Sequence, residues 1–174
     1  MIPAVDHAAL APWQVRRLQP GDVPAVMAIE REIYPFPWTD GNFTDSLIAG
    51  YDAWALIADG VLIGYSVVMW IPDEVHLLNL SIAAGWQGQG IGRRLLGWLC
   101  DSTARRGARA MLLEVRPSND RARRLYESCG FATVGVRKRY YPSFNETRED
   151  ALVMRRMLNL ESAAEPASPG DEPS

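Results

Sequence analysis

Apolar and polar positions alternate along this chain with two periods, one typical of strands and one typical of helices. Period-two or uniformly apolar runs predict strands over Trp13–Leu18, Ala53–Ala58, Val61–Ile71, Glu74–Ile82, Ala110–Val115, Ala132–Arg137 and Ala151–Met157. Three-to-four spacing predicts helices over residues 23–33, 39–49, 90–106 and 119–129. Because strands alternate with helices through the centre, this order of elements predicts an α/β fold with a mixed sheet.

Polar and turn-forming residues mark the ends of these elements. Asp22 and Thr39 stand where helix N-caps are expected. The Asp59-Gly60 pair, between two apolar runs, is typical of a tight β-hairpin. Residues 138–150 are mostly polar, and we expect a long loop there between the last two strands.

Length and composition are those of one globular domain. The 174 residues suffice for one core, and 48% of them are hydrophobic and 22% charged. No run approaches the roughly 20 apolar residues of a membrane span, and the start lacks the basic and apolar regions of a secretory signal. We therefore expect a cytoplasmic protein with no membrane partner. We also expect a flexible N-terminus over residues 1–12, a domain over 13–158 and a disordered tail over 159–174.

Basic residues are concentrated in the second half of the domain. Residues 93–139 contain 12 Lys or Arg and four Asp or Glu, in a chain of net charge −3. They either cover two exposed helices or form a surface for a polyanion such as a phosphate-bearing cofactor. Aromatic residues are not interleaved with them, so we expect no direct contact with nucleic acid. Cys100 and Cys129 lack metal-ligand spacing and the Cys-His pattern of a nucleophilic site, so we expect neither a metal nor a cysteine nucleophile.

A glycine-rich turn connects the strand that ends at Ile82 with the helix that begins near Gly90. Glycines at alternate positions, Gly88, Gly90 and Gly92, allow positive φ and let a ligand approach the main chain. Free amides at the helix start attract an anion. A tight strand–helix connection would need the same glycines, and neither a Walker motif nor a dinucleotide fingerprint is present. Alone, the turn is a weak indication of phosphate binding.

Further motifs, in order along the chain, make the indication specific. Gln87–Gly92 is similar to the Q/R-x-x-G-x-G/A pyrophosphate loop of the GNAT acetyltransferases, and Leu113–Asn119 and Leu125–Phe131 resemble the next two blocks of that family. Arg139–Pro142 and Phe36–Trp38 resemble the ribosomal-protein-alanine N-acetyltransferases within it. The resemblance covers nearly the whole expected domain. It implies a mixed, largely antiparallel sheet with one splayed parallel strand pair, flanked by helices.

The resemblance implies acetyl-CoA as co-substrate and no metal. The pantetheine arm would lie between the splayed strands, and an amide near Ile82 would face the thioester oxygen. The implied contacts are Leu80, Ser81, Ile82, Gln87, Gly88, Gln89, Gly90, Ile91, Gly92, Arg93 and Asn119. Asn119 is equally suited to be a simple N-cap. Relatives often carry Arg in place of Gly88, so Arg93 or Arg94 would compensate for a missing phosphate contact.

The resemblance also implies Glu114 as general base and Tyr126 as general acid. The attacking amine must lose a proton, and an N-terminal ammonium has a pKa of only about 7.7–8.0, so a carboxylate can accept it directly or through water. Tyr126 would protonate the departing thiolate. The structural alternatives are a salt bridge from Glu114 to Arg116 or Arg121 and a core position for Tyr126. His76, on the strand that enters the site, is the alternative base.

The implied acceptor is the N-terminal alanine of small-subunit ribosomal protein eighteen. We expect Phe36 and Trp38 to face Tyr140 and Tyr141 across the acceptor end of the cleft. Packing of Trp38 under the helices is the alternative. Two hypotheses compete with this acceptor. One is another amine, such as lysine, a polyamine or an aminoglycoside, and the other is an acyl-CoA-binding subunit of a tRNA-modification complex.

Overall fold

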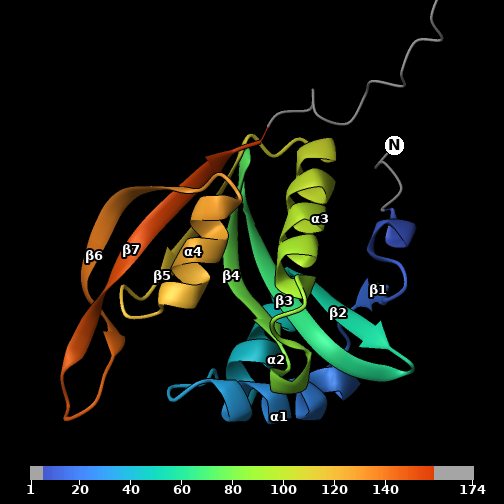
Figure 1. The fold of residues 1–174 in the computed structure, drawn as a ribbon, viewed down its shortest axis with the longest axis horizontal. Coiled ribbons are helices and arrows are strands. Elements are labelled where there is room, and N and C mark those ends of the chain that lie inside the picture. Colours follow the sequence, from blue (N-terminus) through green and yellow to red (C-terminus); the bar gives the residue numbers. More distant parts are fainter. Residues whose placement is uncertain (1–5, 159–174) are drawn as a thin grey trace, which may run out of the picture.

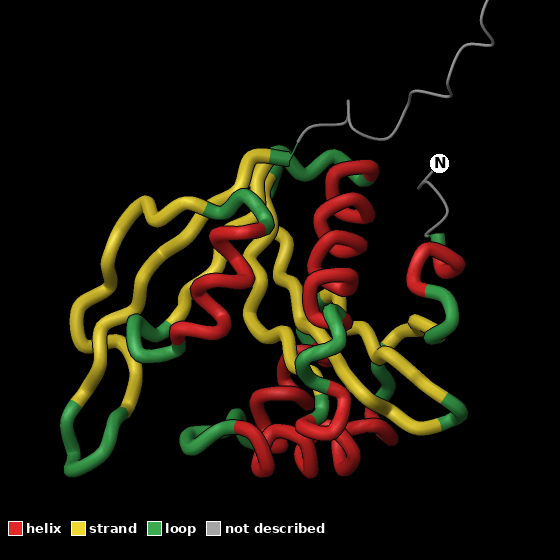
Figure 2. Tube along the Cα trace, viewed as in Figure 1, coloured by secondary structure: helices red, strands yellow, loops and turns green. Residues whose placement is uncertain are grey.

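A seven-stranded mixed sheet organises the chain (Figures 1 and 2). The computed structural model describes residues 6–158. The strands are β1 Gln14–Arg17, β2 Asp52–Ala58, β3 Val61–Ile71, β4 Glu74–Ile82, β5 Ala110–Val115, β6 Ala132–Pro142 and β7 Arg148–Met157. They lie in the order β1-β2-β3-β4-β5-β7-β6. Within these residues β4 and β5 form the one parallel pair. The predicted fold class is therefore confirmed.

Helices cover both faces of the sheet (Figure 1). The helices are α1 Val23–Ile33, α2 Asp40–Ile48, α3 Ile91–Arg105 and α4 Asp120–Ser128, with 3-10 turns η1 His7–Leu10, η2 Pro20–Asp22 and η3 Ala84–Trp86. The buried apolar residues form two clusters, one between the sheet and α3 and α4, the other between the sheet and α1 and α2. Alternate strand residues supply the two clusters. None of the helices described is long and apolar enough to cross a membrane.

The parallel pair is short, and this opens the sheet. β4 pairs with β5 at Val75–Leu77, opposite Met111–Leu113. The register between β3 and β4 shifts directly after Leu77. From there β4 continues to Ile82 against β3, with no further pairing to β5 in the described chain. One edge of residues 78–82 is therefore free to bind an extended ligand.

The last hairpin is more regular than the sequence indicated. β6 continues to Pro142 and β7 begins at Arg148, so the connecting loop spans only residues 143–147. The prediction of a long loop over residues 138–150 is wrong. β6 is an edge strand with mostly exposed side chains, and such a strand carries no alternating apolar pattern.

Part of the N-terminus packs on the domain. η1 buries Leu10, which is 1% exposed. The Trp98 indole donates a hydrogen bond to the Asp6 carbonyl at 2.8 Å, and Arg94 donates to the Ala11 carbonyl at 2.7 Å. The expected flexible terminus through residue 12 therefore differs from the structure, because a buried leucine and contacts from α3 hold this segment. Residues 1–5 and the expected tail, 159–174, lie outside the described residues.

Of the two expected N-caps, Thr39 makes the capping bond and Asp22 does not. The Thr39 hydroxyl accepts from the Asn42 amide at 3.1 Å. The Asp22 carboxylate instead accepts from the Gln19 amide at 2.8 Å and from both Arg16 guanidinium nitrogens at 2.7 and 2.9 Å. These bonds, led by that from Arg16, lower the pKa of Asp22.

Candidate active site

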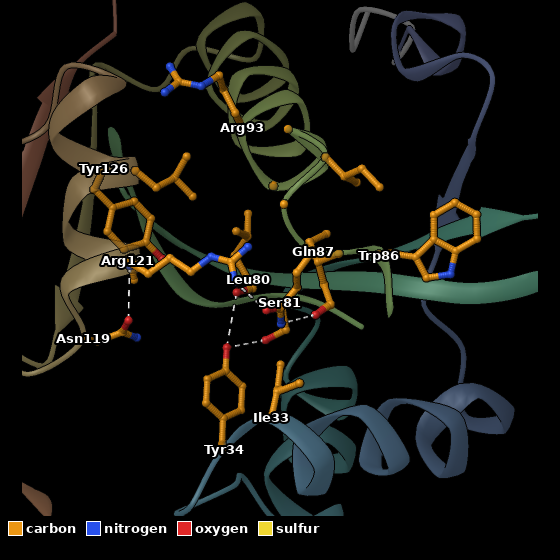
Figure 3. A pocket seen from close by; sticks show the side chains of 17 residues that line it. Ile33, Tyr34, Leu80, Ser81, Trp86, Gln87, Arg93, Asn119, Arg121 and Tyr126 are labelled. Carbon is orange, nitrogen blue, oxygen red and sulfur yellow. Dashed lines mark hydrogen bonds between the residues drawn. The ribbon is translucent and has the colours of Figure 1, made fainter. Parts of the chain in front are cut away.

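A cleft of about 400 Å³ lies where β4 is unpaired (Figure 3). Its walls come from the end of α1, the end of β4, the glycine-rich turn with the start of α3, and α4. The lining residues are Ile33, Tyr34, Leu80, Ser81, Ile82, Trp86, Gln87, Gly88, Gly90, Ile91, Gly92, Arg93, Asn119, Arg121, Ala122, Leu125 and Tyr126. Every residue predicted to contact the cofactor lines this cleft except Gln89. The structure thus brings together three segments that are separate in the sequence.

The turn presents main-chain amides to the cleft. Gly88 and Gly90 have positive φ, 80° and 77°, so both need the left-handed conformation that glycine allows. Gly90 is the N-cap of α3, and no side chain caps the helix there. Gly92 differs from these two: a Cβ at this position would make only ordinary van der Waals contacts, at 3.7 Å, with Ile82 and Leu125, so its surroundings do not require glycine. The first amides of α3 are therefore available to an anion, and the helix dipole favours one.

The arginine beside this turn is Arg121, which the sequence did not single out for the cofactor. Its guanidinium donates to Gln87 Oε1 at 2.9 Å, and Gln87 Nε2 donates to the Ile82 carbonyl at 3.0 Å. Arg93 lines the cleft, but its guanidinium donates to Ser128 Oγ at 2.6 Å. Arg94 points away and stacks on Trp13. Of the two arginines expected to compensate for Gly88, Arg93 thus lines the cleft, whereas Arg94 holds the N-terminal segment.

Asn119 and Tyr126 place α4 against the cleft. The Asn119 side chain accepts from the Ala122 amide at 3.2 Å, so it is the N-cap of α4 and also lines the cleft. Tyr126 is largely buried in the core cluster with its ring against Phe131. Burial, and then the neighbouring hydroxyls of Tyr34 and Tyr141, raise the pKa of Tyr126 above its ordinary value of about 10. It is therefore protonated at neutral pH, as a proton donor must be.

Glu114 lies outside the lining of this cleft, and its carboxylate has two side-chain partners. Its carboxylate accepts from His76 Nε2 and from Arg137 Nε, the latter at 3.1 Å. The suggested bridges to Arg116 or Arg121 are not the ones formed. His76 was considered as an alternative base, and the structure places it in direct contact with Glu114 rather than at a separate site. The register of β4 against β5, with His76 opposite the residue two before Glu114, explains this contact.

Aromatic residues from the loop after α1 and from the β6–β7 hairpin meet around Arg116. The Arg116 guanidinium carbon lies 5.3 Å from the Phe36 ring centre and 4.3 Å from that of Tyr141. The Tyr140 and Tyr141 ring centres are 4.9 Å apart. Burial, and then the Glu114 carboxylate, raise the pKa of Tyr141. These aromatic residues therefore lie near Glu114.

Trp38 does not join this group. Its ring centre lies 5.0 Å from that of Phe43, and it packs on the apolar cluster beneath the sheet. The alternative considered for Trp38, packing under the helices, is the arrangement present. Phe144, which the sequence did not single out, contacts Phe36 instead, with ring centres 5.1 Å apart. It lies in the short loop where a long polar loop was expected.

A buried polar chain beneath the cleft was also missed. Glu30 is 1% exposed and accepts hydrogen bonds from Tyr65, Asn79 and the Trp38 amide. The sequence does carry a signal for it, since Glu30 falls on the apolar face of α1, three residues after Met27. Among residues 6–158, no cluster of three or more potential ligands could hold a metal ion.

Three comparisons with known proteins bear on this site. The model of the acetyltransferase (GNAT) family matches residues 23–131. The [ribosomal protein bS18]-alanine N-acetyltransferase of Escherichia coli K12 is 36% identical over 146 residues, which are 84% of this chain and 98% of that protein. This chain belongs to the GNAT acetyltransferase family. The resemblance drawn from the motifs is confirmed.

Solved structures of GNAT proteins agree with this assignment. The crystal structure of the E. coli ribosomal-protein-S18-alanine N-acetyltransferase matches with a TM-score of 0.78 and 33% identity, over 90% of this chain and 99% of that one. A putative acetyltransferase from Salmonella typhimurium, determined with acetyl-CoA, matches with a TM-score of 0.69 and 21% identity, over 92% and 99% of the two chains. The second likeness concerns the fold alone.

Proposed function

We propose that this enzyme transfers the acetyl group of acetyl-CoA to the N-terminal α-amine of a protein, namely the N-terminal alanine of ribosomal protein bS18. The observation that carries the proposal is the 36% identity, over 84% of the chain, to the E. coli enzyme named for that reaction. Such an acceptor would place the reaction in the cytoplasm. The geometry described above supplies a role for each part of the site.

The cleft fits acetyl-CoA at both ends. The uncapped amides at Gly90 and the Arg121 guanidinium would hold the phosphates, and Asn119 would contact the cofactor from α4. The free edge of β4, at Leu80, Ser81 and Ile82, would hydrogen-bond the pantetheine arm as a neighbouring strand would. The remaining turn residues, Gln87, Gly88, Gln89, Ile91, Gly92 and Arg93, would shape the pyrophosphate site.

The chemistry is direct transfer with two proton carriers. Glu114 accepts the proton that the amine loses as the new N–C bond forms, directly or through water, and His76 stabilises its carboxylate. Tyr126 donates a proton to the sulfur as the C–S bond breaks. Cys100 is a poor nucleophile for a covalent intermediate, because burial raises its thiol pKa to about 11.

The acceptor peptide would enter between Phe36 and the tyrosines of the hairpin, Tyr140 and Tyr141. Trp38 packs on the buried Phe43, so we do not expect it to contact the peptide. The aromatic walls favour a small first side chain, because a large one would clash. A hydrophobic pocket separates substrates that differ by one methylene only about 10- to 200-fold, so we expect modest preference for alanine over serine.

The test is a panel of hexapeptides that differ only in the first residue. They are incubated with acetyl-CoA beside free lysine, spermidine and an aminoglycoside, and the products are identified by mass spectrometry. We expect the Ala-initiated peptide to be acetylated fastest, on its α-amine. Faster acetylation of any small amine would overturn the N-terminal assignment. No turnover on any amine would favour a binding subunit, such as one docked to the tRNA-modification machinery.

A further inference from the structure

A chain of buried polar side chains runs from the interior of the α1 face to the cleft. It begins at the Glu30 carboxylate, passes through Asn79 and Ser81, and ends at the Tyr34 hydroxyl, which lines the cleft. Figure 3 shows its last step, the hydrogen bond between Ser81 and Tyr34. Glu30 and Ser81 are 1% and 2% exposed. Buried hydrogen bonds of this kind have a definite direction, because each group has a limited number of hydrogens to donate.

The direction is set at Glu30. The Trp38 main-chain amide, which can only donate, is 3.0 Å from Glu30 Oε2. Tyr65 and Asn79 Nδ2 donate to Oε1 at 2.8 and 2.7 Å. With three donors converging on it, the carboxylate acts only as an acceptor. The NH2 group of the Asn79 side chain must therefore face Glu30, and its carbonyl oxygen must face Ser81.

The direction of donation set at Glu30 also fixes the direction of the hydrogen bond at Tyr34. Ser81 Oγ donates its single hydrogen to Asn79 Oδ1 at 2.7 Å, so toward Tyr34, also at 2.7 Å, it can only accept. Tyr34 must therefore donate its hydroxyl hydrogen to Ser81. The other nearby group, the Leu80 carbonyl at 3.5 Å, is an acceptor as well. Within residues 6–158 no group donates to the Tyr34 oxygen.

We infer that the Tyr34 hydroxyl accepts a hydrogen bond from the acceptor amine and thereby orients its lone pair toward the thioester. A nucleophilic amine must keep its lone pair free, so its surroundings have to accept its hydrogens rather than donate to it. An oxygen locked as an acceptor meets this requirement. The inference rests on the proposed function, since it presupposes an amine in the cleft. Tyr34 is a positioning residue here, and Glu30 maintains its orientation.

The position of Tyr34 fits this role. It directly follows α1, two residues before Phe36 at the proposed peptide entrance, and it reaches β4 at Leu80 and Ser81, where the thioester would lie. Burial raises the pKa of Tyr34 to about 12, so the hydroxyl stays neutral and keeps its bond to Ser81 over the whole physiological range.

The first test compares Tyr34→Phe with a matched control, Tyr65→Phe. Both substitutions remove one hydroxyl that belongs to this hydrogen-bonded chain. The Tyr65 hydroxyl lies at the buried end, and without it the Glu30 carboxylate still accepts from Asn79 and from the Trp38 amide. We expect Tyr34→Phe to lower kcat/KM for the Ala-initiated peptide about 5- to 20-fold, the size of one lost hydrogen bond. Its acetyl-CoA affinity by calorimetry should be unchanged, and Tyr65→Phe should keep wild-type kcat and KM.

The second test reverses the direction of the chain. In Glu30→Gln the new side-chain oxygen must still accept from the Trp38 amide, so the new NH2 group faces Asn79. The Asn79 side chain then has to rotate so that its carbonyl oxygen accepts from this NH2 group. Ser81 then accepts from Asn79 and donates to Tyr34, and the Tyr34 hydrogen points into the cleft. We expect Glu30→Gln to lose peptide turnover at least as strongly as Tyr34→Phe, and the second substitution to add no further loss in the double variant.

The outcomes separate the two proposals. A wild-type enzyme that does not acetylate the peptide contradicts the proposed function. Active wild type with an equally active Tyr34→Phe overturns the role of Tyr34, as does an equal loss in Tyr65→Phe, which would indicate packing. If Glu30→Gln proves unfolded by circular dichroism, the comparison of the two tyrosine variants decides alone.

Discussion

The Glu114 carboxylate, on β5, is shared between His76 on the adjacent strand β4 and Arg137 on β6, which lies beyond β7 in the sheet. Its side chain is only 8% exposed, so these partners offset the cost of keeping a charge out of water. A carboxylate held by these two bonds is fixed in position, and its charge helps to raise the pKa of Tyr141. That is the arrangement expected of a base that receives its proton at a defined point.

Glu114→Gln should lower kcat on the order of 10²–10⁴-fold, because the amide cannot accept the proton of the amine. Calorimetry should find acetyl-CoA binding nearly unchanged, since Glu114 does not line the cofactor cleft. The control is Glu74→Gln, a carboxylate at the start of β4 that pairs with Arg155 on β7, and this variant should retain wild-type kcat. Near wild-type turnover in Glu114→Gln would move the base to another group, with His76 the next candidate.

At the scale of elements, the proposed phosphate site lies between the turn before α3 and the first turn of α4. The link between them is the hydrogen bond from Arg121 to Gln87. The guanidinium of Arg121 also lies 4.0 Å from where a Cβ on Gly88 would be. A basic group therefore stands close to the position that relatives often fill with Arg, but it comes from a different helix.

Arg121→Gln should weaken acetyl-CoA binding about 10- to 100-fold, because it removes a charge-assisted contact to phosphate. The measurement is calorimetry at several salt concentrations, and the affinity of the variant should depend less on salt than that of wild type. Arg124→Gln, on the same helix but outside the cleft, has the same change of charge and should bind nearly as wild type. Equal weakening in both variants would indicate a general field effect of the basic helix, with no specific contact at Arg121.

Across the whole molecule, tyrosines are buried on both sides of the sheet. Burial is the main cause that raises the pKa of Tyr34, Tyr65, Tyr126 and Tyr141 above the ordinary value of about 10. Above that pH the unfolded chain loses these protons while the folded chain keeps them. Unfolding then releases protons, so the free energy of unfolding falls as pH rises.

Stability should therefore be nearly flat between pH 7 and 9 and decline steeply above pH 10. Each fully buried tyrosine contributes up to about 1.4 kcal/mol per pH unit. Cys100 adds a smaller decline from about pH 9, since its pKa is raised to about 11. Lysine contributes little because Lys138 is the single lysine of the chain. Denaturant unfolding at fixed ionic strength from pH 7 to 11 measures this, and Tyr65→Phe should give a shallower decline. A stability that stays constant to pH 11 would contradict the burial of these hydroxyls.

The sequence by itself determined most of the elements and the glycine-rich turn of the proposed cofactor site, because both depend on local order. Apolar periodicity placed the helices and the inner strands, and caps such as Thr39 and Asn119 act within three residues of themselves. The positive φ of Gly88 and Gly90 likewise belongs to one short turn. For the same reason only the first half of the exposed edge strand β6 was predicted, and its second half, residues 138–142, was assigned to a loop because it carries no apolar alternation.

Only the tertiary structure decided which partners meet. Glu114 contacts His76 because three residues of β4 pair with β5 in one register, and no local pattern encodes that register. Arg121, on α4, donates to Gln87 in the glycine-rich turn, whereas Arg94, on α3, donates to the N-terminal segment. Which of the two lies beside the turn depends on how α3 and α4 pack. Glu30 could be suspected from its place on an apolar helix face. Its connection to Tyr34 runs through Asn79 and Ser81, which lie far along the sequence on β4, so it exists only after α1 packs on β4.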